Sequence, residues 1–566
     1  MDKRWINYPL PPVKEITDLG KELNINSYLT AILLHRGITD FASAKKFFRP
    51  SLEHLHDPFL MQDMEKAVVR LKQAIDGNEK ILIYGDYDVD GTTAVAVVYS
   101  YLKSFYPNCD FYIPDRYAEG YGVSEAGIVW AEENGFSLII ALDLGIKAGD
   151  MVTMASHKGI DFIICDHHLP GGQIPNAVAV LDPKRDDCAY PFNELSGCGL
   201  GLKLIQAFSK KFRDEKEVFE YLDLVAVSIA SDIVPINGEN RALAFFGLQK
   251  LNQNPRPGLK ALKEIAAIKT DLDISAVVFT LGPRINAAGR VAHGKAAVEL
   301  LIAKTEEEAN ELAEKVNIKN DLRREFDLNI TEEAVAMIEG DEALRTAKST
   351  VLFKNTWHKG VIGIVAARCV EKYYRPTVIL TESNDKVTGS ARSVKDFDLY
   401  QALENCSDLL EKYGGHKYAA GLTLDRNNVD AFQKRFEEVV SASITEEMQT
   451  PVVEVDIVIP LNAILPKFIS VLKQMAPFGP ENPKPTFEAR NLYVANSLSS
   501  FKDKHVRFLV GQRGSETVFQ VVGFDLSEHY SRLANGDSFK MAFTIEENMY
   551  NGITSIQLRA KDIKFE

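Results

Sequence analysis

Short apolar runs alternate with helix-spaced segments through the first half of the chain. Apolar positions recur every three or four residues in Thr92–Phe105, Glu125–Asn134 and Ala148–His157, which predicts helices. Between them lie five predicted strands: Lys80–Gly85, Asp110–Pro114, Leu138–Leu142, Asp161–Cys165 and Ala177–Leu181. This order predicts an α/β domain with a doubly wound parallel sheet, followed by mainly helical chain from Leu200 to Leu251.

The second half changes its pattern twice. Residues 303–343 are rich in Glu, Lys, Ala and Asn at helical spacing, which predicts a long, solvated helical connector. A second α/β unit follows, with predicted strands at Ser349–Phe353, Thr377–Leu380 and Lys386–Ser393 and predicted helices at Val361–Tyr373 and Leu399–Lys412. Beyond a proline-rich segment at 477–485, five short alternating strands and one helix predict a small β-barrel of OB type: Glu488–Ala495, His505–Val510, Thr517–Phe524, Phe539–Glu546 and Ile556–Lys564.

These patterns divide the chain into five predicted parts. They are a helical N-terminal lead-in (1–60), a first α/β domain (61–302), the connector (303–343), a second α/β domain (344–450) and a nucleic-acid-binding barrel (451–566). No apolar run reaches the roughly 18 residues of a membrane span, and the N-terminus lacks the apolar core of a secretion signal. The six cysteines form no Cys-x-x-Cys pair. Together these features predict a cytoplasmic protein without a membrane partner.

The net charge of −14 counts against a protein coated in basic charge for DNA binding. A local groove of Lys and Arg on an acidic body can still follow a phosphate backbone. The charge therefore leaves nucleic acid open as a substrate.

Acidic and imidazole side chains follow three of the predicted strands. Asp86, Asp88 and Asp90 follow the first, Asp143 follows the third, and the run Asp166-His167-His168 follows the fourth. A parallel sheet gathers such positions along one edge. Carboxylates with neutral imidazoles suit Mn²⁺ or Mg²⁺ sites of two-metal phosphodiester chemistry.

Less specific interpretations exist for these residues. One aspartate is a favoured helix N-cap, and a histidine pair in a loop is often a solvated surface feature. An EF-hand is disfavoured, because the glutamate at loop position twelve is missing and the flanking elements are a strand and a helix. Three carboxylates exceed the needs of one cap, so we favour the metal interpretation.

Taken together, the motifs identify a likeness to a known family. Gly85-Asp-Tyr-Asp-Val-Asp-Gly91, Leu142-Asp-Leu-Gly145, Asp166-His-His-Leu-Pro170 and Ser231-Asp-Ile-Val-Pro235 occur in the order typical of the DHH phosphoesterase superfamily, and the chain most resembles its bacterial exonucleases specific for single-stranded DNA. The resemblance implies two Mn²⁺ or Mg²⁺ ions. Their implied ligands are Asp88, Asp90, Asp143, His167 and Asp232, with Asp86 either a ligand or a supporting residue. It also implies that His168, Asp166 and Arg290 contact or support the scissile phosphate.

The resemblance also implies which residues bind the substrate. Arg284, Asn286 and Arg290, in the block Pro283-Arg-Ile-Asn-Ala-Ala-Gly-Arg290, would contact the DNA backbone. Taken alone, this block also suits a surface patch at a helix end. The remaining implied contacts are Arg116, Ser390 and Arg392, which would hold the 5′ end, and Gly415 and His416 of the second α/β domain.

The implied activity is 5′→3′ digestion of single-stranded DNA to 5′-mononucleotides in DNA repair and recombination. A single-strand-binding protein and a helicase are the expected protein partners, and a monomer is expected. The chain ends soon after the barrel, so we expect it to lack the additional C-terminal domain of some relatives. Two alternatives remain: a phosphodiesterase for short oligonucleotides or cyclic dinucleotides, and a replication scaffold without catalysis. The barrel and lead-in disfavour the first, and the filled ligand positions disfavour the second.

Overall fold

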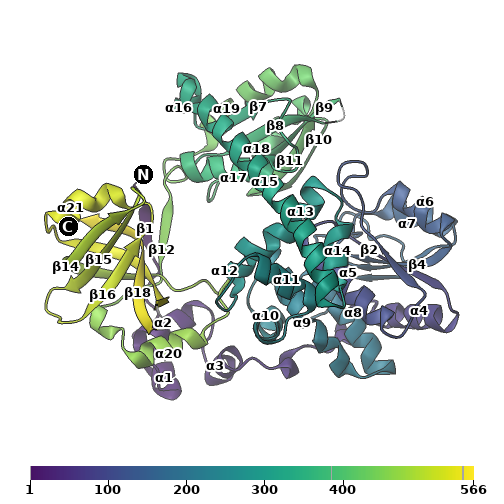
Figure 1. Cartoon of the computed structure of the whole chain (residues 1–566), viewed down its shortest axis with the longest axis horizontal. Coiled ribbons are helices and arrows are strands. Elements are labelled where there is room, and N and C mark those ends of the chain that lie inside the picture. The colour runs from purple at the N-terminus through teal and green to yellow at the C-terminus, as the bar shows by residue number, and fades with distance from the viewer. Residues whose placement is uncertain (1, 384, 551–552, 566) are drawn as a thin grey trace. The chain divides into compact units, whose positions relative to one another are not determined.

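The computed structural model describes residues 2–383, 385–550 and 553–565 (Figure 1). The chain divides into two compact units. The parallel-sheet unit contains Lys45–Arg323 and Met475–Pro483, and the second unit contains Met1–Ala44, Arg324–Gln474 and Lys484–Glu566. The five-part division predicted from the sequence stays a prediction.

A five-stranded sheet forms the centre of the parallel-sheet unit. Its strand order is β3-β2-β4-β5-β6, and every neighbouring pair is parallel. The strands are β2 (Lys80–Gly85), β3 (Cys109–Tyr112), β4 (Phe136–Leu142), β5 (Asp161–Cys165) and β6 (Ala179–Leu181). This confirms the doubly wound fold. The strand order reverses between β2 and β4, and ligands of such sheets bind in the crevice outside the carboxyl ends at that point.

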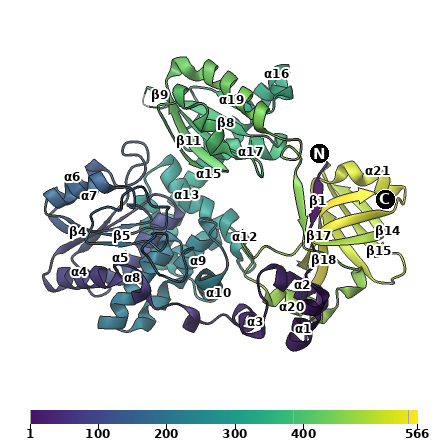
Figure 2. The same ribbon diagram turned by 180° about the vertical axis from the view of Figure 1, so that it is seen from behind.

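Helices cover both faces of this sheet (Figure 2). Helices α6 (Glu125–Glu133) and α7 (Gly149–His157) share one apolar core with one face of the strands. A larger core on the other face involves α4 (Met64–Asp76), α5 (Val89–Lys103) and α8 (Gly197–Phe212). The helices that follow are α9 (Leu222–Ser231), α10 (Gly238–Gln253), α11 (Pro257–Ile265), α13 (Gly282–Val291) and α14 (Lys295–Ile302).

The connector is one helix, α15 (Glu306–Gly340), as predicted. The proline-rich segment is irregular, again as predicted: among its described residues only an isolated bridge joins Gly479 and Asn482. The guanidinium of buried Arg241 fastens the start of this segment, donating hydrogen bonds to the carbonyl oxygens of Ala476 at 2.9 Å and Pro477 at 3.3 Å.

The second unit contains a mixed five-stranded sheet of order β10-β11-β9-β8-β7. Its strands are β7 (Thr350–Phe353), β8 (Thr377–Ser383), β9 (Lys386–Arg392), β10 (Lys412–His416) and β11 (Ala419–Leu424), and its helices are α17 (Ile362–Tyr373), α18 (Leu399–Glu404) and α19 (Val429–Ser443). The predicted helix Leu399–Lys412 is wrong in its second half. It ends at Glu404, and Lys412 starts β10, which pairs with β11. The glycines that follow Tyr413 cost a helix about 1 kcal/mol each, and pairing with β11 satisfies their backbone groups instead.

A barrel-like sheet completes the second unit, confirming the predicted five strands with one helix, α21 (Tyr530–Ala534). An additional pairing of β14 with β17 connects the sheet back on itself. The five predicted strands are β14 (Phe487–Phe501), β15 (His505–Gln512), β16 (Val518–Gly523), β17 (Phe539–Tyr550) and β18 (Ile553–Phe565). A sixth strand of two residues, β13 (Ile457–Val458), pairs in parallel with β14.

The N-terminal lead-in contains helices α1 (Val13–Leu23), α2 (Ser27–His35) and α3 (Phe41–Phe48). It also contains an unpredicted strand, β1 (Arg4–Asn7), which pairs in parallel with β12 (Val452–Val455). None of the helices in the described part of the chain combines the length and apolarity needed to cross a membrane.

Candidate metal centre

Carboxylates gather where β2, β4 and β5 end, because these strands are parallel neighbours. Asp86, Asp143 and Asp166 each follow directly on one of them, and each is at most 3 % exposed. Asp143 has a left-handed backbone conformation, with φ of +62°, which Asp tolerates better than most residues. The predicted edge of acidic side chains therefore exists.

Helix α5 begins at Val89, three residues before its predicted start at Thr92. Asp88 is its N-cap, and its carboxylate accepts a hydrogen bond from the N–H of Gly91 at 3.0 Å. Asp90 consequently lies in the first helical turn rather than in a loop. One of the three aspartates does have the capping role considered for it, and the other two need another explanation.

Asp90 is anchored by three donors. Its Oδ1 accepts hydrogen bonds from the N–H of Cys198 at 2.8 Å and the hydroxyl of Ser228 at 2.7 Å. Its Oδ2 accepts a hydrogen bond from the N–H of Gly197 at 2.6 Å. The first turn of α8 thus holds the carboxylate, and Ser228 places it beside α9. The last residue of α9 immediately precedes Asp232.

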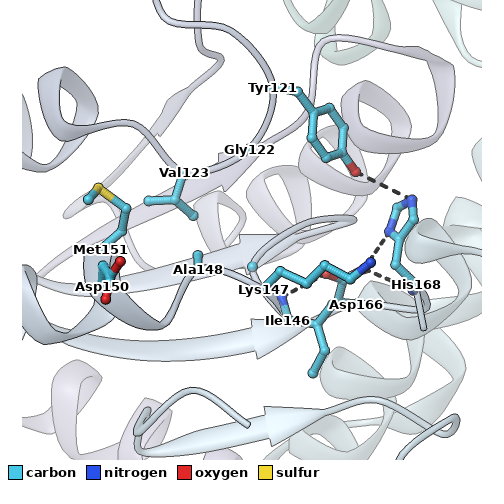
Figure 3. A pocket seen from close by; sticks show the side chains of 11 residues that line it. Tyr121, Gly122, Val123, Ile146, Lys147, Ala148, Asp150, Met151, Asp166 and His168 are labelled. Atoms are coloured by element: carbon cyan, nitrogen blue, oxygen red, sulfur yellow. Dashed lines mark hydrogen bonds and ion pairs between the residues drawn. The ribbon is translucent and has the colours of Figure 1, made fainter. Parts of the chain in front are cut away.

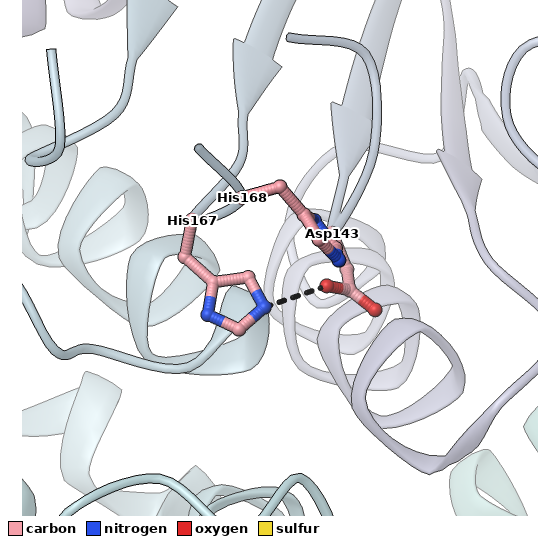
Figure 4. Close-up of side chains that lie close together, drawn as sticks. All are labelled: Asp143, His167 and His168. Atoms are coloured by element: carbon pink, nitrogen blue, oxygen red, sulfur yellow. Dashed lines mark ion pairs between the residues drawn. The ribbon is translucent and has the colours of Figure 1, made fainter. Parts of the chain in front are cut away.

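The two adjacent histidines have different surroundings. His167 is buried, and its Nε2 lies 3.2 Å from Asp143 Oδ1 (Figure 4), 3.5 Å from Asp232 Oδ2 and 3.7 Å from Asp90 Oδ2. His168 is more exposed, and its Nδ1 hydrogen-bonds Asp166 Oδ1 at 2.7 Å. His167 therefore belongs to the carboxylate cluster, and His168 lies at its margin.

Three overlapping sets of side chains have donor atoms within 4.8 Å of one another: Asp86, Asp88 and Asp143; Asp90, His167 and Asp232; and Asp143, His167 and His168. The third set shares Asp143 with the first set and His167 with the second. In the described part of the chain, the buried Oδ1 atoms of Asp86 and Asp143 receive no hydrogen bond. Buried carboxylate oxygens that receive no hydrogen bond and lie beside an imidazole suit a divalent cation such as Mg²⁺ or Mn²⁺. The donor set fits a metal centre.

The electrostatics agree with this fit. Burial, and then repulsion by Asp90, raise the pKa of Asp143 well above its ordinary value. Burial, and then repulsion by Asp88, likewise raise the pKa of Asp86. Burial and Asp90 raise the pKa of Asp232 to about 9. Without cations the cluster resists full ionisation, and bound cations would reverse this.

Asp166 has the opposite behaviour. Burial alone would raise its pKa, but the hydrogen bond from His168 and those from the N–H groups of Ile146 at 2.9 Å and His168 lower it. Burial alone would lower the pKa of His168, but its hydrogen bond to Asp166 and the negative charge of that carboxylate raise it. Asp166 thus orients His168 and favours its protonated form, and the Nε2 of His168 lies 3.3 Å from the hydroxyl of Tyr121 (Figure 3).

Helix α13, which carries the predicted arginines, packs against two segments of the metal centre. A Cβ on Gly289 would lie 2.6 Å from the carbonyl oxygen of Tyr87, and one on Gly282 would lie 3.0 Å from Ser231 Oγ. Larger residues would push the helix away. Its two ends are thereby fixed beside Asp86–Asp88 and Asp232.

The basic side chains near this helix have different roles. Arg284 donates hydrogen bonds to Thr280 O at 2.7 Å and Asn317 Oδ1 at 3.1 Å, so it makes contacts within the protein. Asn286 is half-buried on α13. The carbonyl oxygen of Arg290 accepts a hydrogen bond from the hydroxyl of Tyr117, while the guanidinium of Arg116 lies over the Tyr87 ring at 4.9 Å.

The other predicted contacts lie in the second unit. Ser390 and Arg392 are on β9, and Arg392 Nη1 donates to Ser390 Oγ at 3.1 Å. Burial lowers the pKa of Arg392. Gly415 has a φ of +146°, and both it and His416 are exposed on β10. The structure thus brings Ser390 and Arg392 together on one strand.

Sequence reasoning missed two residues. Ser228, which holds Asp90, had no signal of its own within an apolar helix. Asp182 had one, because it follows the apolar run of β6 just as Asp143 follows β4. It is fully buried, and burial raises its pKa to about 7.

Comparisons with known proteins agree on one family. Residues 80–229 match the model of the DHH family N-terminal domain, 346–442 the DHHA1 domain and 455–562 the RecJ OB domain. The single-stranded-DNA-specific exonuclease RecJ of Bacillus subtilis is 36 % identical over 99 % of this chain and 70 % of its own length. That of Escherichia coli is 30 % identical over 98 % of each. The crystal structure of RecJ in complex with Mn²⁺ from Thermus thermophilus superposes with a TM-score of 0.85 at 26 % identity, covering 100 % of this chain and 80 % of that one.

Proposed function

The chain belongs to the RecJ family of DHH exonucleases specific for single-stranded DNA, and from this premise we propose that it hydrolyses single-stranded DNA from the 5′ end to 5′-mononucleotides. The polarity and the product follow from the resemblance of its motifs to this family. The observation that carries the catalytic part is the cluster of carboxylates and imidazoles at the end of the parallel sheet.

We infer that the cluster holds two divalent cations, Mn²⁺ or Mg²⁺. Asp143 belongs to the donor set of Asp86 and Asp88, and its Oδ1 also lies 3.2 Å from Nε2 of His167, which supports a carboxylate shared between two ions. Asp86 and Asp88 would complete one site, and Asp90, His167 and Asp232 the other. When bound, such cations lower the pKa of water and neutralise charge on the phosphate.

His168, Asp166 and Arg290 are the residues we assign to the scissile phosphate. Asp166 would accept a hydrogen bond from Nδ1–H of His168, and in the imidazolium form the Nε2–H of His168 would donate toward a phosphate oxygen. The N–H of Ile146 binds the second oxygen of Asp166 and keeps this carboxylate in place. Arg290, at the end of α13, would neutralise a neighbouring phosphate.

The remaining assignments concern the strand. Arg116, Arg284 and Asn286 would bind its backbone from the parallel-sheet unit. In the second unit, Ser390, Arg392, Gly415 and His416 would bind the 5′-terminal part. Phosphate contacts of this kind position a strand without reading its sequence. A single-strand-binding protein and a helicase are the protein partners that we propose.

Substrate length separates this proposal from a phosphodiesterase for short oligonucleotides. We expect a strand of ~50 nucleotides to be digested at least as efficiently as one of ~5 nucleotides, with Mn²⁺ present, because the barrel adds backbone contacts. A strong preference for the short strand would contradict the proposal. Asp143→Ala should abolish turnover of both, and retained turnover would contradict the metal centre.

A further inference from the structure

A short segment that follows α20 (Pro466–Gln474) belongs to a different unit from the chain on either side of it. We call this segment, Met475–Pro483, the arm. Gln474 before it and Lys484 after it are part of the second unit, whereas the arm is part of the unit that contains the metal centre. Its first residue, Met475, is fully buried. The later part of the chain thus supplies a piece of the parallel-sheet unit.

Hydrogen bonds give the arm a fixed shape. Asn482 is 2 % exposed, and its Nδ2 donates to the carbonyl oxygens of Met475 at 2.9 Å and Pro477 at 2.7 Å. The backbones of Gly479 and Asn482 exchange two hydrogen bonds, at 2.9 and 3.0 Å. The prolines of the arm lack an N–H, so its few remaining donors determine its conformation together with the guanidinium of Arg241 described above.

The arm contacts the loop that follows Asp232. This loop, residues 233–237, joins α9 to α10, and we call it the Asp232 loop. The N–H of buried Ile236 donates a hydrogen bond to the carbonyl oxygen of Pro480 at 2.8 Å. A Cβ on Gly479 would lie 2.5 Å from Cγ1 of Ile236. The two segments therefore come so close that a residue without a side chain is needed at position 479.

The Asp232 loop needs such support, because it begins with a strained residue. Ile233 has a φ of +60°, which a β-branched residue rarely adopts, and its exposed side chain has little packing to hold it there. Strain of this kind persists only where the surroundings impose it. One support is Asn240 of α10, whose Nδ2 donates to the carbonyl oxygen of Pro235 at 3.1 Å. The other is the arm. Without it, Ile233 could relax and turn Asp232 away from the other donors.

We propose that the arm is a positioning element of the metal centre, acting through the Asp232 loop to keep the Asp232 carboxylate within reach of a divalent cation. The inference rests on the proposed two-metal exonuclease and extends it to residues that supply no ligand themselves. Partners that orient metal ligands typically change metal affinity by about 10–100-fold when they are altered. The affinity of the parallel-sheet unit for metal would thus depend on the segment between α20 and β14.

Gly479→Ala tests the proposal through Mn²⁺ binding to the full chain without DNA, followed by the electron paramagnetic resonance signal of free Mn²⁺. Its added methyl group would press on Ile236. We expect the dissociation constant of one of two bound ions to rise about tenfold or more, and that of the other to stay within about twofold. Unchanged binding in a folded variant would overturn the proposal, and circular dichroism reports the folding.

Gly523→Ala, on β16, is the matched control. A Cβ there would lie 2.9 Å from Cδ1 of Leu526, so the substitution crowds an apolar side chain outside the parallel-sheet unit. Both Mn²⁺ dissociation constants should stay unchanged, and an equal loss in this variant would overturn the proposal. Asn482→Ala alters the arm without adding bulk, by removing the two hydrogen bonds of its Nδ2. It should weaken binding of the same ion, and unchanged binding would contradict the role of the arm.

A double variant separates positioning from a general loss of structure. If the arm acts through Asp232, Gly479→Ala should cause no further loss of Mn²⁺ affinity once Asp232→Asn has removed that ligand. A further loss of about tenfold in the double variant would overturn the proposal. Failure of the exonuclease function would look different, since the wild-type protein would then bind Mn²⁺ and cleave no strand, while the arm variants would still differ from it in Mn²⁺ binding.

Discussion

Replacing Asp143 with Asn measures the repulsion that the metal centre stores in the absence of cations. Donor oxygens of Asp143, Asp86 and Asp88 lie within 4.8 Å of one another. Two unit charges at that distance repel by about 3.5 kcal/mol at an effective dielectric constant of 20. Partial protonation reduces this cost, in line with the raised pKa of Asp143. We expect Asp143→Asn to stabilise the metal-free protein by about 1–3 kcal/mol.

The substitution is conservative in shape. Asn occupies the same volume and tolerates the left-handed backbone that Asp143 adopts. Volume matters here, because a Cβ on Gly197 would lie 2.6 Å from the Cβ of Asp143, so this segment is closely packed. A change in stability would therefore report the lost charge.

The assay is thermal unfolding in chelator and in Mn²⁺. In chelator the variant should unfold at a higher temperature than the wild type. In saturating Mn²⁺ the order should reverse, because a cation that binds only the folded wild type stabilises it by mass action. A lower unfolding temperature of the variant in chelator would refute the reasoning, as would equal stabilisation of both proteins by Mn²⁺.

Asp166→Asn is the matched control, with the opposite expected sign. This carboxylate also follows a strand of the same sheet, but it accepts hydrogen bonds from Ile146 and from His168, which lower its pKa. Losing a charge-assisted hydrogen bond costs about 1.5–3 kcal/mol. We expect the variant to be destabilised by this amount in chelator.

Three further predictions follow from buried charge and backbone strain. In chelator, unfolding temperatures measured from pH 5 to pH 9 should fall as the pH rises. The pKa of Asp232 is about 9 in the folded protein, above its value in the unfolded chain, so the stability that its bound proton provides is lost through that range. Bound Mn²⁺ should flatten this dependence of the unfolding temperature on pH. Ile233, which is 63 % exposed with φ of +60°, strains the backbone, so Ile233→Asn should raise the free energy of unfolding in urea by about 1 kcal/mol, while Ile233→Ala should not. Lys203 forms a fully buried ion pair with Glu239, with Nζ and Oε1 2.6 Å apart. Lys203→Met should lower the free energy of unfolding in urea by about 3–5 kcal/mol, and adding Glu239→Gln should recover part of that loss. A second, additive loss of stability in the double variant would contradict the pairing.

Much of the metal centre could be predicted because its chemistry follows strands. Asp86, Asp143 and Asp166 each come directly after an apolar run, and a parallel sheet places such positions at one edge. Asp232 follows a helix, so periodicity gave no reason to single it out, and only its motif did. Ser228 supports Asp90 through a contact between residues 138 positions apart, which local patterns do not encode.

The errors in the fold have a related cause. Strand β1 contains only four residues and is defined by its partner β12, which lies far along the chain. The helix predicted to reach Lys412 ends early, because β10 gains more from pairing with β11 than from continuing a helical pattern. Local sequence preferences predict the long helices and strands, whereas pairing with distant strands determines the short ones.

The most direct test of the exonuclease function uses one single-stranded DNA oligonucleotide labelled separately at its 5′ and 3′ ends, incubated with Mn²⁺ or with chelator. We predict immediate release of a 5′-labelled mononucleotide and gradual shortening of the 3′-labelled strand, both only with Mn²⁺. Immediate release of a 3′-labelled mononucleotide would contradict the polarity. Equal cleavage in chelator would contradict the metal centre on which the account depends.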